Sequence, residues 1–277
     1  MPTCYVVGAG DFTPRGFAPG PGDLVVAADG GYRALYSLGY TPDLLLGDFD
    51  SLGDLPLPAD LPVLRFPVRK DDTDAGLALR HGLDLGFRDF ALYGCAGGRV
   101  DHLLANFQSM ARVSRLGATV RLAAPDYDAW SLTGPAPDAP APAPGGPAPN
   151  APAPGLAPSG PAPNAPTPAP APGGRAPNAP APATPAAPDA PAPDALAPAA
   201  VLALPPRPGG TLVSVFCQGD RAEGVTLAGL AYPLSDAALT GDFPLGVSNR
   251  RLDGQRATVA VRRGTLLILQ SAGPDIA

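Results

Sequence analysis

Two short acidic segments, twenty residues apart, hold the side chains best suited to chemistry: LGDFDS at residues 46–51 and KDDTD at residues 70–74. Asp48 and Asp50 are two positions apart, so an extended backbone places both carboxylates on one face. Mg2+ prefers oxygen ligands and usually lies between one or two carboxylates and substrate phosphates. The two segments therefore predict an enzyme that acts on a Mg2+-bound nucleotide.

The second acidic segment joins a cation to a predicted helix start. Backbone N–H groups at a helix start favour anions, and Lys70 there can reach a phosphate. Asp74 is a candidate metal ligand, or a base that accepts the proton of an attacking hydroxyl. Ordinary local structure is the alternative for both segments: a turn around Asp48 and Asp50, and a capped helix with an acidic first turn at residues 71–74.

A third segment, GGRVDH at residues 97–102, precedes the best predicted helix. Glycine lets the backbone approach a phosphate closely, and Arg99 can neutralise charge that builds up during phosphoryl transfer. Asp101 can instead cap the helix, and His102 can simply lie on its surface. Asn106 follows His102 by one turn and shares its face.

Through the first 124 residues, short apolar runs typical of strands alternate with segments whose apolar residues have helical spacing. This alternation predicts crossover connections and a mostly parallel sheet. Ligands of such sheets bind beyond the carboxyl ends of the strands. Asp29, Asp48 and Gly94 each follow a predicted strand, so we expect them at the same edge. The predicted strands span 3–7, 24–28, 44–46, 63–66, 90–93 and 119–123, and the helices span 32–38, 72–85 and 101–116.

Helical spacing fades after residue 124, and short strands predict an antiparallel sheet there. The sequence is accordingly divided into an α/β domain, residues 1–124, and an all-β sandwich domain, residues 125–277. The predicted strands of the second domain are 212–216, 224–230, 257–261 and 265–269.

A low-complexity tract at residues 135–208 interrupts the β domain and holds 27 of the 40 prolines but only five charged residues. The heptapeptide GPAPNAP begins at residue 146, recurs at residue 160, and recurs imperfectly at residue 174. Proline blocks helices and sheet ladders, so a solvated, extended and disordered tract is expected. It is either a tolerated expansion of a surface loop, or a spacer or ligand for proline-binding modules.

Composition excludes several classes of protein. The net charge of −6 argues against a general binder of nucleic acids or anionic membranes. Three cysteines, far apart in a chain of 277 residues, form neither a disulfide framework nor a zinc spacing, which favours the reducing cytoplasm. No apolar run approaches the roughly 20 residues of a membrane helix, and no secretory signal is visible at the N-terminus.

Taken together, the motifs resemble those of the thiamine pyrophosphokinase family. In order they are ADGG at 28–31, GDFDS at 47–51, KDDTD at 70–74, GRVDH at 98–102, GLAYPL at 229–234 and GVSN at 246–249. The resemblance covers essentially everything outside the proline-rich tract. It implies an α/β catalytic domain, a β-sandwich that helps to bind thiamine, and a homodimer with shared active sites.

The resemblance also assigns roles to individual residues. Asp48, Asp50 and Asp74 resemble the family's Mg2+-binding and catalytic aspartates, with Lys70 and Arg99 beside the phosphates. Tyr232 falls where the family places an aromatic residue that stacks on thiamine. The motifs place Asp29, Gly30, Gly31, Asp71, Thr73, Gly98, Arg99, Asp101 and His102 on the ATP side, and Lys70, Asp74, Tyr232, Ser248 and Asn249 on the thiamine side.

The implied reaction is attack of the thiamine hydroxyl on the β-phosphorus of ATP, which gives thiamine diphosphate and AMP. Two alternatives remain open at this stage. One is a diphosphokinase for another heterocyclic alcohol, such as a hydroxymethylpterin, because a stacking surface accepts either ring system. The other is a non-catalytic interaction protein that presents the proline-rich repeats to partners.

Overall fold

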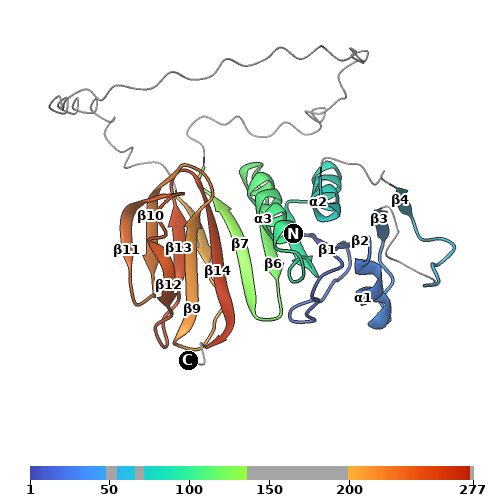
Figure 1. Ribbon diagram of the computed structural model, residues 1–277, viewed down its shortest axis with the longest axis horizontal. Coiled ribbons are helices and arrows are strands. Elements are labelled where there is room, and N and C mark those ends of the chain that lie inside the picture. The colour runs from blue at the N-terminus through green and yellow to red at the C-terminus, as the bar shows by residue number, and fades with distance from the viewer. Residues whose placement is uncertain (48–54, 66–71, 136–198, 275–277) are drawn as a thin grey trace, which may run out of the picture. The chain divides into compact units, whose positions relative to one another are not determined.

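The computed structural model describes residues 1–47, 55–65, 72–135 and 199–274 (Figure 1). The first part of the chain contains β1 (Thr3–Val7), β2 (Leu24–Ala28), α1 (Gly31–Ser37), β3 (Leu44–Gly47), β4 (Val63–Arg65), α2 (Asp74–Asp84), β5 (Asp89–Tyr93), α3 (Val100–Arg115) and β6 (Thr119–Ala123). The remaining strands are β7 (Tyr127–Thr133), β8 (Ala200–Ala203), β9 (Thr211–Cys217), β10 (Arg221–Ala228), β11 (Leu234–Thr240), β12 (Gly246–Arg250), β13 (Thr258–Val261) and β14 (Thr265–Pro274).

Ten of these strands form one mixed sheet in the order β12-β9-β14-β7-β6-β5-β1-β2-β3-β4. The pairs from β6 to β4 are parallel, and the pairs from β6 to β12 are antiparallel. The predicted fold class, a mostly parallel α/β sheet joined to an all-β sandwich, is confirmed for the described residues.

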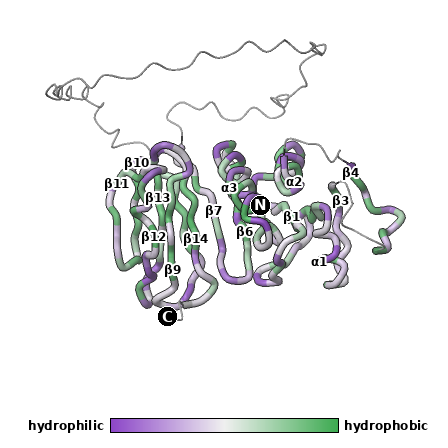
Figure 2. The backbone as a smooth tube through the Cα atoms, in the orientation of Figure 1, coloured by the Kyte–Doolittle hydropathy of each residue, from purple (hydrophilic) through white to green (hydrophobic). Residues whose placement is uncertain are grey.

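Helices cover both faces of the parallel strands, which explains the continuous apolar runs in the sequence. Along β1, Val6 belongs to the core under α2 and α3, whereas its neighbour Val7 belongs to the core under α1. Figure 2 shows the resulting hydrophobic stretches along the strands. The predicted helices and strands of this half are all present, with boundaries that differ by one or two residues.

The antiparallel strands β7, β14 and β9 continue the same sheet and pack against a second sheet of order β11-β10-β13-β8. Their shared core contains Trp130, Val215, Leu227 and Ile268, all at most 7% exposed. Four strands of the described residues were not predicted from the sequence: β7, β8, β11 and β12. Strands β11 and β12 are largely solvent-exposed, so their hydrophobic alternation is weak.

The proline-rich tract ends earlier in the chain than its composition predicts. Residues 136–198 lie outside the described residues, but Ala200–Ala203 form β8, which pairs with β13. Leu204 is only 4% exposed and belongs to the sandwich core. The expectation of a solvated tract up to residue 208 is therefore wrong for residues 200–204, because a pairing partner and a core were available to them.

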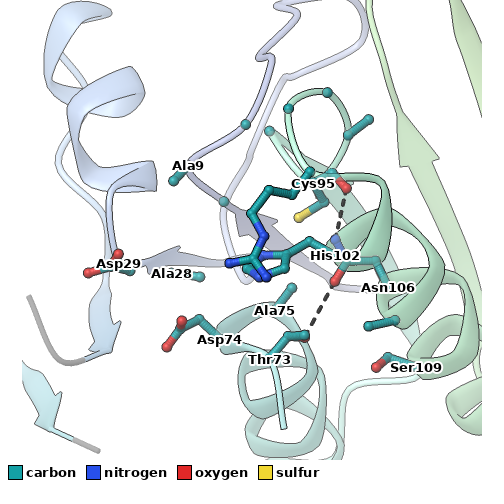
Figure 3. A pocket seen from close by; sticks show the side chains of 18 of the residues that line it. Ala9, Ala28, Asp29, Thr73, Asp74, Ala75, Cys95, His102, Asn106 and Ser109 are labelled. Atoms are coloured by element: carbon teal, nitrogen blue, oxygen red, sulfur yellow. Dashed lines mark hydrogen bonds between the residues drawn. The ribbon is translucent and has the colours of Figure 1, made fainter. Parts of the chain in front are cut away.

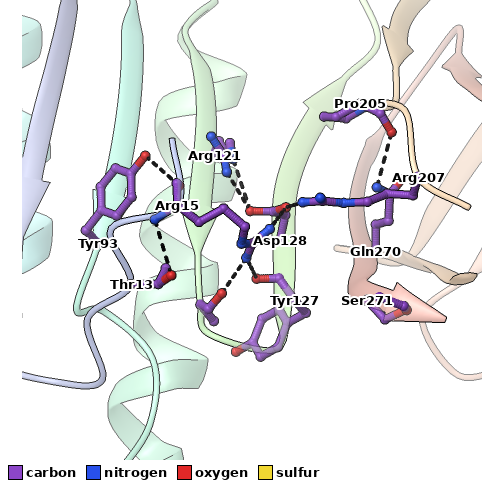
Figure 4. Close-up of polar contacts among 12 residues, drawn as sticks. Thr13, Arg15, Tyr93, Arg121, Tyr127, Asp128, Pro205, Arg207, Gln270 and Ser271 are labelled. Carbon is purple, nitrogen blue, oxygen red and sulfur yellow. Dashed lines mark hydrogen bonds and ion pairs between the residues drawn. The ribbon is translucent and has the colours of Figure 1, made fainter. Parts of the chain in front are cut away.

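A buried carboxylate connects three distant segments of the described fold. Asp128 at the start of β7 is fully buried and accepts hydrogen bonds from Arg15 at 2.6 Å, Arg121 at 2.8 Å and Arg207 at 3.1 Å (Figure 4). Arg15 also donates to the backbone oxygen atoms of Ala124 and Tyr127. The loop after β1, the β6–β7 hairpin and the segment before β9 are thus joined at one point.

Within the described residues, no helix is long and apolar enough to cross a membrane.

Candidate active site

The site lies at the carboxyl ends of β1, β2 and β5. From β1 the chain proceeds to β2, β3 and β4 on one side, and returns through α2 to β5 on the other side. Such a reversal of strand order opens a crevice between the loops that follow the central strands. A cavity of about 1020 Å3 occupies this position, lined by residues 8–10, 28–29, 72–75, 94–99 and one face of α3.

The floor of the cavity is built from glycine backbone. Gly8 donates to Tyr93 O at 2.8 Å, and Gly10 donates to Gly94 O at 2.7 Å. A Cβ atom on Gly10 would lie 2.2 Å from the carbonyl oxygen of Ala96, so only glycine allows this approach. The two loops therefore present backbone rather than side chains, as a site for a phosphate chain requires.

The start of α2 forms a second wall. Thr73 caps the helix, because its hydroxyl accepts a hydrogen bond from Gly76 N at 3.0 Å. Asp72 pairs with Arg80 on the same helix, and Asp74 occupies the first turn. The alternative of a capped helix with an acidic first turn is therefore confirmed for residues 72–74, and the same three residues also line the cavity.

Asn106 fixes the third wall, helix α3, to the rest of the site. Its side chain is 6% exposed and donates to Cys95 O at 2.8 Å. Its Oδ1 accepts a hydrogen bond from the Thr73 hydroxyl at 3.4 Å. One buried amide thus connects the loop after β5, the start of α2 and α3 (Figure 3).

The charged residues of the cavity lie on different walls. Asp29 follows β2 with a φ of +47° and lines the side facing α3, as does Asp74 (Figure 3). Arg99 and His102 line the opposite side, at the start of α3. Arg99 donates to Asp101 at 3.1 Å, and this hydrogen bond holds the pKa of the Asp101 carboxyl below its usual range. Asp101 does not cap α3, since Arg99 occupies the N-cap position.

Thiol chemistry at the site is disfavoured. Cys95 lines the cavity, but its side chain is buried and its Sγ donates to Tyr93 O at 3.4 Å. Burial raises the pKa of the Cys95 thiol to about 12. The group is therefore protonated at neutral pH and is a poor nucleophile.

The described donor set suits a hard cation. Asp29 and Asp74 supply carboxylate oxygens to the cavity, and oxygen is the donor that Mg2+ prefers. Among the described residues, no group of three or more His, Cys, Asp or Glu is close enough to hold a metal ion unaided. The remaining predicted ligands, Asp48 and Asp50, lie outside the described residues, as do Lys70 and Asp71.

Other predicted nucleotide-side residues divide into two groups. Thr73, Gly98, Arg99 and His102 line the cavity together with Asp29 and Asp74. Gly30, Gly31 and Asp101 do not. Gly31 instead lets α1 start against β1, since a Cβ there would lie 1.8 Å from Val7 O.

The predicted thiamine-side residues Tyr232, Ser248 and Asn249 lie around β12, away from the cavity. Tyr232 is 70% exposed. Asn249 is 3% exposed, and its side-chain amide forms two hydrogen bonds with the backbone of Tyr232. The Asn249 Oδ1 accepts from Tyr232 N at 2.9 Å, and the Asn249 Nδ2 donates to Tyr232 O at 2.7 Å. Ser248 has a φ of +59°, a strained conformation for a residue other than glycine, and its N–H donates to Ser214 Oγ. The side-chain amide of Asn249 is thus used to hold the backbone of Tyr232 in place.

Four residues that line the cavity were not predicted as site residues from the sequence: Gly8, Gly10, Ser109 and Arg112. Gly8 and Gly10 carry a signal, because both directly follow the first predicted strand. Ser109 and Arg112 extend the face of α3 that contains Ala105, at spacings of four and seven residues. Helical periodicity could have found them once the helix was known to border the site.

Comparison with known proteins agrees with this geometry. Residues 21–122 match the family model described as "Thiamin pyrophosphokinase, catalytic domain", and residues 201–266 match "Thiamin pyrophosphokinase, vitamin B1 binding domain". Thiamine pyrophosphokinase of Bacillus subtilis (strain 168) is 31% identical over 103 residues, which is 36% of this chain and 48% of that protein. This sequence match thus spans about half the length of the relative.

Solved structures extend the comparison to almost the whole fold. The crystal structure of thiamine pyrophosphokinase from Bacillus subtilis superposes with a TM-score of 0.65 at 19% identity, covering 99% of this chain and 100% of that one. Thiamin pyrophosphokinase from Candida albicans gives a TM-score of 0.59 at 10% identity, with 98% and 88% covered. At these identities the structures show the fold alone. With two domain models of one family matched in order, the resemblance drawn from the motifs is confirmed, and the chain belongs to the thiamine pyrophosphokinase family.

Proposed function

We propose that this chain is a thiamine diphosphokinase, which transfers a diphosphate group from ATP to thiamine with the help of Mg2+. The observation that carries the proposal is the cavity at the strand-order reversal, with glycine backbone on its floor and the Asp29 and Asp74 carboxylates on its wall. The match of residues 201–266 to a vitamin B1 binding domain supports thiamine as the acceptor over other heterocyclic alcohols.

In the proposed reaction, the primary hydroxyl of thiamine attacks the β-phosphorus of ATP. The bond from that phosphorus to the oxygen bridging the α-phosphate breaks, and AMP leaves with the electron pair. Asp74 orients the hydroxyl or accepts its proton, and Arg99 offsets charge on the transferring group. The glycine loops and the start of α2 hold the phosphates in line. Asp48, Asp50 and Asp74 would hold Mg2+, which supplies neutralisation of phosphate charge when bound.

A homodimer with shared active sites accounts for the position of the thiamine-side residues. β12 is separated from β5 by four intervening strands, and five strand spacings amount to about 24 Å along the sheet. Tyr232, whose backbone is bonded to Asn249 on β12, does not line the cavity of its own chain. We propose that residues 1–124 form the catalytic domain, that residues 125–277 form the thiamine-binding domain, and that each domain completes the active site of the partner subunit.

The proposed compartment is the cytoplasm. Cys4, Cys95 and Cys217 are all free thiols, and none is paired in a disulfide. Two of them are buried in the α/β half, where a reducing compartment would leave them unmodified.

The decisive experiment measures AMP. Purified chain with thiamine, ATP and Mg2+ is expected to release AMP in step with thiamine diphosphate, and the Asp50→Asn variant should lose most turnover while keeping its circular dichroism spectrum. A panel of other alcohols, including a hydroxymethylpterin, tests the acceptor. Release of ADP would reject the diphosphate transfer, and a faster rate with the pterin would reject thiamine as the substrate.

Tyr232→Ala is expected to raise the KM for thiamine about 5-fold, because a stacked aromatic ring contributes about 1 kcal/mol beyond its buried area. The KM for ATP and the unfolding temperature should not change, since the ring is 70% exposed in the single chain. Tyr232→Phe keeps the ring and should behave like the wild type. Steady-state kinetics with each substrate varied provides the measurement, and an unchanged thiamine KM in Tyr232→Ala would remove the ring from the substrate site.

A further inference from the structure

Arg112 lies on the α3 wall of the cavity, beyond the motif that begins the helix. Ala105, Ser109 and Arg112 are spaced by four and then three residues, so they share one face of α3, and all three line the cavity. From His102 to Arg112 the helix rises about 15 Å at about 1.5 Å per residue. The wall is thus long enough for Arg112 to contact one end of an extended triphosphate whose other end lies at the start of α3.

The charge of Arg112 is available to a ligand. Arg99, the other arginine that lines the cavity, is paired with Asp101, and the lining residue Asp72 is paired with Arg80. No carboxylate of the described residues forms an ion pair with Arg112, and its side chain is exposed. The facing side of the cavity carries Asp29 and Asp74 (Figure 3). An anion in the cavity would therefore find its strongest direct attraction on the α3 wall.

We infer that Arg112 is a further binding residue for the phosphate chain of the nucleotide, an inference that rests on the proposed function. A planar guanidinium matches the geometry of phosphate oxygens with two parallel hydrogen bonds, which an ammonium group cannot do. Arg112 lies on the side of the cavity opposite the carboxylates of Asp29 and Asp74. Its contribution to the binding free energy therefore grows with the number of phosphate groups in the ligand and persists without a metal ion.

The test compares ligands that differ in phosphate content. Isothermal titration calorimetry on the full chain measures the Kd of inorganic tripolyphosphate, ATP and AMP, with Mg2+ and again with EDTA. Arg112→Met keeps most of the side-chain length without the charge, and it should weaken tripolyphosphate and ATP about 10- to 100-fold, as expected for a charged hydrogen bond. AMP should lose less than about threefold, and Arg112→Lys should lie between the two. Arg256→Met, which removes an exposed arginine that does not line the cavity, is the matched control and should bind like the wild type.

The outcomes separate this inference from the proposed function. If wild-type chain binds ATP but Arg112→Met binds tripolyphosphate equally well, the role of Arg112 is overturned and the proposed function stands. An equal loss of affinity for AMP and ATP would also overturn it, because Arg112 would then contact the part of the nucleotide that both ligands share. If the wild type binds neither ATP nor tripolyphosphate, the proposed function itself fails, and the inference with it.

Discussion

Asp74→Asn is expected to lower kcat about 100- to 1,000-fold, the range seen when one preorganised electrostatic group is removed from a catalytic site. Asp74 lines the cavity from the first turn of α2, and the proposed reaction uses its carboxylate toward both the hydroxyl of thiamine and Mg2+. Asparagine keeps the shape but can neither accept a proton nor bind a cation as strongly. The KM for ATP should rise less than kcat falls, because the glycine loops and Thr73 remain in place.

The fold should tolerate this change. Replacing one acidic group in the first turn of a helix costs about 0.3–1 kcal/mol through the helix dipole. Asp84→Asn, at the opposite end of α2, is the matched control, since its side chain is exposed and does not line the cavity. Rates of AMP release and urea unfolding curves are measured for both variants. Equal activity in Asp74→Asn and Asp84→Asn would exclude Asp74 from the chemistry.

The α/β half of the fold could be predicted almost completely from the sequence. Buried parallel strands are short apolar runs that often end at glycine or aspartate, and four of the six runs here are followed by such a residue, as at Gly8, Asp29 and Gly94. The site was predictable for the same reason, because parallel strands bring the residues that follow them to one edge. Residue type made both Asp72 and Thr73 candidates for the cap of α2, and the structure shows that Thr73 is the cap.

The parts that escaped prediction depend on contacts between distant segments. Exposed strands such as β11 and β12 have no apolar face that the sequence could show. The polar contacts of Asn249 became visible only when β12 and Tyr232 lay side by side. Asp128 likewise looks like an ordinary aspartate between two strands, and only the fold brings three arginines to it.

Asp128→Asn is expected to lower the free energy of unfolding by about 3 kcal/mol. Breaking a buried ion pair by removing one partner costs about 3–5 kcal/mol, because the other charge stays buried without compensation. The lower end applies here, since the side chains of Arg15, Arg121 and Arg207 are 22–28% exposed and water can partly solvate them. An asparagine can still accept hydrogen bonds, but it cannot offset three positive charges that converge on one point.

The same arginine cluster predicts which segments of the chain lose stability in Asp128→Asn. Arg207 and Arg251 already lie close enough for their charges to repel, and burial together with Arg207 lowers the pKa of Arg251. Loss of the only carboxylate that Arg207 contacts among the described residues should therefore loosen the segment before β9, and with it the docking of β8 on the sandwich. Hydrogen exchange should become faster at residues 200–211 and at the β6–β7 hairpin, while the start of α2 stays protected. Asp126→Asn, an exposed change two residues away, is the matched control and should leave the urea midpoint unchanged. If both variants unfold at the midpoint of the wild type, the arginine cluster does not depend on Asp128, and solvent must compensate the three charges instead.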